Sequence, residues 1–208
     1  MRLVLASNNA KKLSELRAML GGLALELCAQ GELGIAETEE PHITFIENAL
    51  AKARHAALLS GGAALADDSG VCVDALDGAP GVVSAHYAQV PAAAGAREDQ
   101  RRAQDAANNA LLLQRMQGQL ERRAHFVSTL VAVRHAQDPQ PLVAVGRWPG
   151  EILTATRGAM GFGYDPLMFI PPLGRTVAEM EAELKNQHSH RARALVQLLA
   201  QMREVWSL

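Results

Sequence analysis

The chain has 208 residues and a formal net charge of −2, so it lacks the basic excess that a general nucleic-acid binder carries. Hydrophobic residues make up 49% of it, enough for the core of one large domain or two small lobes. No apolar run approaches the roughly 18 residues of a membrane span, and the N-terminal one is too short for a signal peptide. Cys28 and Cys72 lack metal-site spacing and are predicted to be free thiols. We therefore expect a cytoplasmic protein that acts neither on nucleic acids nor in a membrane.

The N-terminal segment predicts a strand followed by a capped helix. Residues 2–6 suit a buried strand, and residues 7–9 are typical helix-capping residues. From 10 to 20 the apolar residues recur at helical spacing. The free amides of a first helical turn can bind an anion, to which Lys12 would add a positive charge. An ordinary strand-to-helix connection with a solvated lysine explains the same residues equally well.

Residues 24–29 are a second strand candidate, and the segment from 31 to 42 is acidic and irregular. Three glutamates of this segment, Glu37, Glu39 and Glu40, stand close before a proline. Such a bunch is typical of a solvated loop. It can also bring a carboxylate to a metal ion.

A capping box predicts the next helix. Thr44 is followed three residues later by Glu47, and the helix is expected to run to about Leu59. Asn48 and Lys52 are four residues apart and therefore share one face of this helix. That face points either to solvent, the common case, or to a binding site.

Residues 64–74 place two adjacent carboxylates, Asp67 and Asp68, between apolar runs. Aspartate and glycine are poor strand residues, so the residue types favour a turn between two strands. In the alternative, the segment is one extended strand, and the two carboxylates point to opposite faces. One of them would then be presented to a cation or to a water molecule.

The second half of the chain predicts further elements in alternation. The expected elements are a surface loop at 88–97, a helix at 98–116, a strand at 125–133, strands at 142–145 and 152–156 joined through residues 146–150, a short helix opened by a capping box at 176–179, a polar break at 185–188, and a last helix from 190 to about 205 capped by Ser189. Strands and helices interleave without strict regularity. A mixed α/β sheet is therefore expected rather than a fully parallel one.

One loop concentrates aromatic residues in a chain whose aromatic content is only 4%. Phe162, Tyr164 and Phe169 fall within eight residues, beside two glycines. A flat base can lie on such a loop, and a turn anchored by its aromatics explains it as well. His188 and His190 are a weak zinc signal, because no third ligand is near.

Taken together, these segments offer the means to bind phosphate, a hard metal ion and a flat base, the three parts of a nucleoside triphosphate. The sequence is similar to the inosine triphosphate pyrophosphatase family, which hydrolyses non-canonical purine nucleoside triphosphates. The resemblance covers nearly the whole chain. It is carried by six motifs in order: Ala6-Ser7-Asn8-Asn9 with Lys12 and Glu15, Thr44-Phe45-Ile46-Glu47-Asn48-Ala49, Ala66-Asp67-Asp68-Ser69-Gly70, Gly78-Ala79-Pro80-Gly81, Gly161-Phe162-Gly163-Tyr164-Asp165-Pro166, and Lys185 with Ser189-His190-Arg191.

The resemblance implies one nucleotide pyrophosphatase domain over residues 1–208, an elongated mixed sheet flanked by helices, with two lobes and a substrate cleft between them. It implies a homodimer, a purine nucleoside triphosphate substrate and Mg²⁺ as cofactor. Asp68 is the implied catalytic carboxylate and metal ligand. Glu39 is the implied second ligand, with the choice between Glu39 and Glu40 open because Pro41 and His42 depart from the family pattern. The implied substrate-binding residues are Ser7, Asn8, Asn9, Ala10, Lys11, Lys12 and Lys52 for the phosphates, with Ser69 against the substrate and Phe162, Gly163, Tyr164, Asp165, Lys185, His190 and Arg191 around the base.

The expected reaction is attack of water on the α-phosphorus with release of pyrophosphate. Donors such as Arg191, or amides at the start of the last helix, are expected to pair with the 6-oxo group of hypoxanthine or xanthine. Two other functions fit the same residues. One is a pyrophosphatase for other modified nucleotides, and the other is a nucleotide-binding protein without turnover.

Overall fold

The N-terminal strand and its helix form as the sequence predicts. The computed structural model describes residues 1–21, 25–90 and 97–207 of the chain. Strand β1 (Arg2–Leu5) leads into helix α1 (Ala10–Leu20), whose first turn is capped by the side chain of Asn9. Strand β2 (Glu26–Ala29) follows, so the predicted strand is confirmed from residue 26 on, and residue 24 lies outside the described part.

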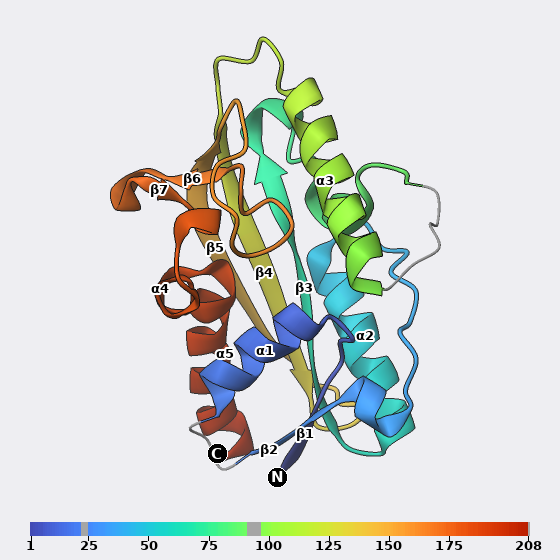
Figure 1. Cartoon of the computed structure of the whole chain (residues 1–208). Coiled ribbons are helices and arrows are strands. Elements are labelled where there is room, and N and C mark those ends of the chain that lie inside the picture. Colours follow the sequence, from blue (N-terminus) through green and yellow to red (C-terminus); the bar gives the residue numbers. More distant parts are fainter. Residues whose placement is uncertain (22–24, 91–96, 208) are drawn as a thin grey trace. The chain divides into compact units, whose positions relative to one another are not determined.

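Seven strands form one mixed sheet in the order β2-β1-β3-β4-β5-β6-β7. Strand β1 is parallel to β2 and β3, and β6 is antiparallel to β5 and β7 (Figure 1). The mixed α/β class is therefore confirmed. The remaining elements are α2 (Phe45–Ser60), β3 (Ala63–Val73), α3 (Arg97–Arg115), β4 (Arg123–Val133), β5 (Leu142–Ile152), β6 (Met168–Ile170), β7 (Arg175–Thr176), α4 (Ala182–His188) and α5 (His190–Trp206), with short 3-10 turns between them.

The chain divides into two compact units. Unit 1 comprises residues 1–68, 128–147 and 189–208, and unit 2 comprises residues 69–127 and 148–188. Of the predicted loop at 88–97, residues 91–96 lie outside the described part. Within the described ranges, no helix is long and apolar enough to cross a membrane.

In unit 1, alternate residues of the strands pack on different helices. Leu65 of β3 belongs to a cluster with buried residues of α1 and α5, whereas Ala64 and Ala66 pack with the alanines of α2. This alternation follows from the two-residue period of a strand. It also fixes the directions in which the next residues of β3 point.

Four sequence predictions about local structure are wrong. Residues 64–74 do not turn, because β3 runs unbroken through Asp67 and Asp68, whose charges are paired with side chains of unit 1. The predicted polar break at 185–188 is the second half of helix α4, because the ammonium group of Lys185 is paired with Asp165 and needs no solvent.

The other two wrong predictions concern strand β5 and the residues after it. Residues 146–150 lie inside the single strand β5 rather than in a turn, and the strand predicted at 152–156 does not form, because β5 ends at Ile152 and residues 153–156 are not in a strand. Buried positions alternate through the whole strand, with Trp148 in the core. Gly146 lies on the buried side, where a Cβ atom would stand 2.0 Å from the carbonyl oxygen of His190. At Gly150 the corresponding atom would stand 2.4 Å from the carbonyl oxygen of Phe169. The glycines therefore allow close approach of backbones instead of forming a turn.

Candidate active site

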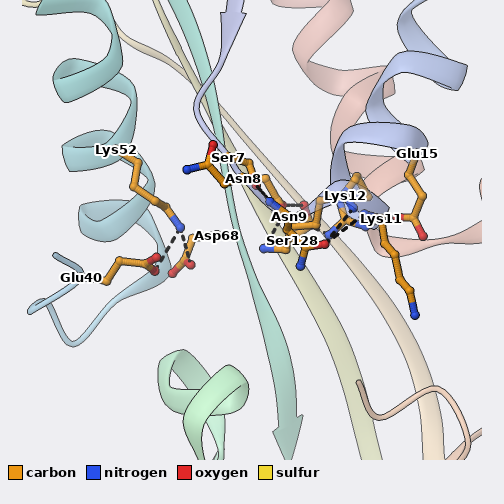
Figure 2. Close-up of polar contacts among 12 residues, drawn as sticks. Ser7, Asn8, Asn9, Lys11, Lys12, Glu15, Glu40, Lys52, Asp68 and Ser128 are labelled. Atoms are coloured by element: carbon orange, nitrogen blue, oxygen red, sulfur yellow. Dashed lines mark hydrogen bonds and ion pairs between the residues drawn. The ribbon is translucent and has the colours of Figure 1, made fainter. Parts of the chain in front are cut away.

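The carboxylate of Asp68 lies at the centre of a cluster in unit 1 that three separate segments build. Lys52 reaches from α2 and places its Nζ 2.8 Å from Oδ1 of Asp68 and 3.0 Å from Oε2 of Glu40 (Figure 2). The prediction that Asn48 and Lys52 share a face is confirmed, and that face is buried rather than solvated. Asn48 hydrogen-bonds both backbone groups of His42 and thereby holds the acidic segment against the helix.

The environment of Asp68 changes its acidity. Burial raises the pKa of Asp68 to about 6, although the nearby Lys52 acts in the opposite direction. Burial also acts to lower the pKa of Lys52, but Asp68 and Glu40 outweigh it and raise that pKa, so the ammonium stays charged. The second carboxylate oxygen of Asp68, Oδ2, is buried and has no hydrogen-bond partner among the described residues.

Asp67 points to the opposite side of β3, into a group of four charged residues. Its carboxylate accepts from Lys12 at 2.9 Å, from Nη2 of Arg191 at 3.0 Å and from the hydroxyl of Ser128 at 2.6 Å. Arg191 also pairs with Glu15. The side chain of Asp67 has no exposed surface and that of Arg191 has 1%, so two positive and two negative charges offset each other in the interior.

The start of α1 lies beside Ser128, which donates to Asp67, as Figure 2 shows for the labelled residues. The side-chain oxygen of Asn9 accepts from the amides of Lys11 and Lys12, and Ser7 accepts from the amide of Asn9. The Asn8 amide donates to Glu37. Residues 7–12 therefore form a loop that is already ordered by its own side chains, with Lys12 anchored at Asp67.

A second group of predicted residues lies together in unit 2. The Nζ atom of Lys185 is 2.8 Å from Oδ2 of Asp165 and 4.5 Å from the centroid of the Phe162 ring. The same oxygen of Asp165 accepts from the amide of Phe162. A Cβ atom at Gly161 would stand 2.1 Å from that oxygen, so this position requires glycine. Tyr164 is buried and its hydroxyl donates to the carbonyl of Ser84, with burial raising the pKa of the phenol.

The structure distributes the predicted site residues as follows. Unit 1 holds Ser7 to Lys12, Lys52, Asp68, His190 and Arg191, whereas unit 2 holds Ser69, residues 162–165 and Lys185. Glu39 and Glu40 are both exposed, and Glu40 contacts Lys52 beside Asp68. In the described part of the chain, no group of three His, Cys, Asp or Glu residues is arranged to hold a metal ion.

Sequence reasoning singled out Asp67 without assigning it a partner, and it did not place three further polar residues in these groups, namely Ser128, Asp105 and Asn109. A polar residue within an apolar strand, as at Ser128, and the neighbouring asparagines of α3 are the signals that point to them. Neither signal indicates with which residue these side chains form hydrogen bonds.

Comparison with known proteins identifies the family. A model of the Ham1 family matches residues 3–201. The chain belongs to the Ham1 family. This confirms the resemblance that the six motifs indicate.

Relatives within the Ham1 family match over nearly full length. The chain is 70% identical to the dITP/XTP pyrophosphatase of Methylibium petroleiphilum, over 99% of both chains, and 64% identical to that of Leptothrix cholodnii, over 100% of both. Among solved structures, it is similar to a HAM1 protein of Coxiella burnetii, with a TM-score of 0.87, 39% identity and 99% and 100% of the two chains covered. A structure of the nucleoside-triphosphatase / dITP/XTP pyrophosphatase of Mycobacterium abscessus matches with a TM-score of 0.70, 40% identity and 96% and 99% covered.

Proposed function

We propose that this Ham1 family protein hydrolyses non-canonical purine nucleoside triphosphates, dITP, ITP and XTP, to the monophosphate and pyrophosphate. The observation that carries the proposal is the buried Asp68 carboxylate, with one oxygen paired to Lys52 and the other without a hydrogen-bond partner in the described structure. The names of its full-length relatives support the same substrates.

Asp68 has the properties of a general base for the attacking water. A catalytic base works best when its pKa is near the working pH, and burial has moved that of Asp68 to about 6. The carboxylate accepts a proton from water as the oxygen of that water bonds to the α-phosphorus. The bond from this phosphorus to the bridging oxygen breaks at the same time, and pyrophosphate leaves with the electron pair.

Lys12 and Lys52 of unit 1 are placed to donate hydrogen bonds to the negatively charged phosphate groups of the substrate. An ammonium group has three donors, and Lys52 uses two of them on Asp68 and Glu40. Lys12 is held by Asp67 and remains 17% exposed. Each lysine therefore keeps its carboxylate partner and can still donate to a phosphate oxygen, offsetting the charge that grows on it during the reaction.

The residues around Asp68 also fit Mg²⁺. A magnesium ion prefers oxygen ligands, and with nucleotides it is usually held by one or two carboxylates while phosphates and waters complete the shell. The unpartnered Oδ2 of Asp68 and the carboxylate of Glu40 are such oxygens, and the absence of a three-residue cluster in the described part agrees with that arrangement. We propose Glu40 as the second ligand, since the contact of its carboxylate with Lys52 places it beside Asp68. Bound Mg²⁺ would offset charge on the phosphate oxygens.

The purine base is proposed to bind to residues of unit 2. A purine ring can stack on Phe162, whose own position is supported by the contacts with Lys185 and Asp165. A donor aimed at the 6-oxo group would be left unpaired by adenine, which costs about 1–3 kcal/mol when the donor is buried. The roles of His190 and Arg191 in the base pocket stay predictions. Arg191 already donates to Asp67 and Glu15, and its loss would remove one of the two cations that Asp67 contacts.

The decisive experiment measures pyrophosphate release from dITP, XTP, dGTP and dATP with Mg²⁺. We expect rapid release from dITP and XTP, little from the other two, and near loss of activity in Asp68→Asn. The matched control is Asp74→Asn, which removes an exposed carboxylate shortly after Asp68 and should keep the rate. Equal cleavage of all four nucleotides would refute the base selectivity, and binding without release would make the protein a nucleotide binder.

We also propose that the protein is a homodimer in the cytoplasm, as the family resemblance implies. Light scattering coupled to gel filtration measures the mass directly. A mass near 22 kDa, that of a single chain, would refute the dimer.

A further inference from the structure

Both peptide groups that flank Phe162 donate to a carboxylate of unit 2. The amide of Phe162 donates to Asp165 at 2.9 Å, and the amide of Gly163 donates to Oδ2 of Asp105 at 2.8 Å. A peptide group is planar, so fixing the planes on both sides of a residue fixes its backbone and the direction of its Cα–Cβ bond, from which the ring extends. Asp165 lies within the loop, whereas Asp105 comes from helix α3.

The next peptide group is held by the same helix. Asn109 donates from Nδ2 to the carbonyl of Gly163 at 2.8 Å and to the carbonyl of Asp105 at 2.7 Å. It is 7% exposed, and its Oδ1 is buried without a hydrogen-bond partner in the described part of the chain. An asparagine at a buried helical position costs helix propensity and desolvation compared with leucine. The hydrogen bond from Asn109 to the carbonyl of Gly163 offsets these costs.

The loop around Phe162 needs these hydrogen bonds from α3 because its two glycines allow many backbone conformations. Gly161 and Gly163 have φ angles of 79° and 61°, a region that glycine enters freely. Without outside partners, these residues would lose conformational freedom each time a base bound to Phe162. A neighbouring residue of α3, Asn108, also donates to the carbonyl of Ser84, which accepts from Tyr164 of the loop. One turn of α3 therefore holds Gly163 directly at both its amide and its carbonyl, and is linked to Tyr164 through Ser84.

We infer that Asp105 is a positioning residue for the purine base, which holds the Phe162 ring in its binding orientation before the nucleotide arrives, with Asn109 in support. The inference rests on the proposed function and names the means by which the base platform is preorganised. It requires that Asp105 act through Phe162 and not on the phosphates. Its loss should therefore raise KM and leave kcat nearly unchanged.

The test is a double-mutant cycle on dITP hydrolysis with Asp105→Ala, Phe162→Ala and the double variant. We expect Asp105→Ala to raise KM for dITP about tenfold, as loss of a hydrogen bond to a charged group predicts, with kcat within about twofold. In the Phe162→Ala background the same change should have little further effect. Asp105→Asn keeps an oxygen that can accept from Gly163 and should restore most of the affinity. Asp99→Ala, which removes an exposed carboxylate of the same helix, is the matched control.

Two results would overturn the inference. One is an unchanged KM in Asp105→Ala. The other is an equal rise in KM with and without the Phe162 ring, which would make Asp105 a stability residue only. If Asp105→Ala does not fold, Asn109→Leu enters the cycle in its place, with the same coupling to Phe162 expected. Wild-type protein that releases no pyrophosphate would refute the proposed function instead, and dITP binding by calorimetry in the same variants would then decide the inference.

Discussion

The raised pKa of Asp68 predicts a stability effect that is separate from catalysis. In the unfolded chain an aspartate titrates near its usual value of 3.8, whereas in the folded protein burial raises the pKa to about 6. The folded state therefore binds this proton more tightly than the unfolded state. Ionised Asp68 costs folding free energy, and this cost grows as the pH rises through the window between the two values. Asp68→Asn removes the titration.

The expected size follows from the two pKa values. Between about pH 4.5 and about pH 8, the unfolding free energy of Asp68→Asn should rise relative to wild type by about 2 kcal/mol. The introduced asparagine keeps an oxygen for Lys52, and any constant contribution of the substitution cancels when the two pH values are compared. The pH-dependent part reports the titration of Asp68 together with its effect on the neighbouring Glu40, if Mg²⁺ is removed with a chelator.

Urea unfolding followed by the fluorescence of Trp148 and Trp206 measures this difference. Asp138→Asn is the matched control, because hydrogen bonds from Arg134 lower the pKa of Asp138, so its titration lies below the window and its difference should stay flat. A constant difference between wild type and Asp68→Asn across the window would refute the raised pKa. The same protonation of Asp68 is expected to lower kcat/KM as the pH falls below about 6. With a constant stability difference, such a decrease in kcat/KM would have to come from another group.

Three further predictions test other parts of the structure. Glu40→Gln should raise the Mg²⁺ concentration that gives half-maximal activity several-fold, whereas Glu39→Gln should leave it unchanged. An increase in Glu39→Gln without one in Glu40→Gln would identify Glu39 as the second ligand. Gly146→Ala should lower the unfolding free energy by about 2 kcal/mol or more, because its Cβ would meet the backbone of His190, and an unchanged melting temperature would contradict this close approach. Phe162→Ala should raise KM for dITP about tenfold with a smaller change in kcat, and Phe162→Trp should keep affinity, so equal KM values for all three proteins would exclude stacking.

The sequence predicted best where local chemistry decides the structure. The capping residues Asn9, Thr44 and Ser189 begin three of the helices that the pattern predicts, because a cap bonds amides within its own first turn. The motifs also identified the family, and they singled out Asp68 and Lys52, which the structure brings together.

The sequence-based predictions were wrong where the contacts that explain a residue come from segments distant in the sequence. Asp67 and Asp68 looked like a turn because isolated carboxylates rarely lie in a buried strand, and their partners come from segments that no local pattern connects to them. Glycines at 146 and 150 looked like a turn because the backbones that approach them belong to distant elements.

The sequence by itself determined the helix starts and the chemical types that a nucleotide pyrophosphatase needs, and it gave the alternation of residues 64–73 only for the case that they are extended. Only the tertiary structure decided that Asp68 meets Lys52 and Glu40, that Asp67 meets Arg191, and that Asp105 holds Gly163. The physical reason is that capping and alternation act over a few residues. Ion pairing and burial instead depend on which segments the folded chain brings within about 3 Å of each other.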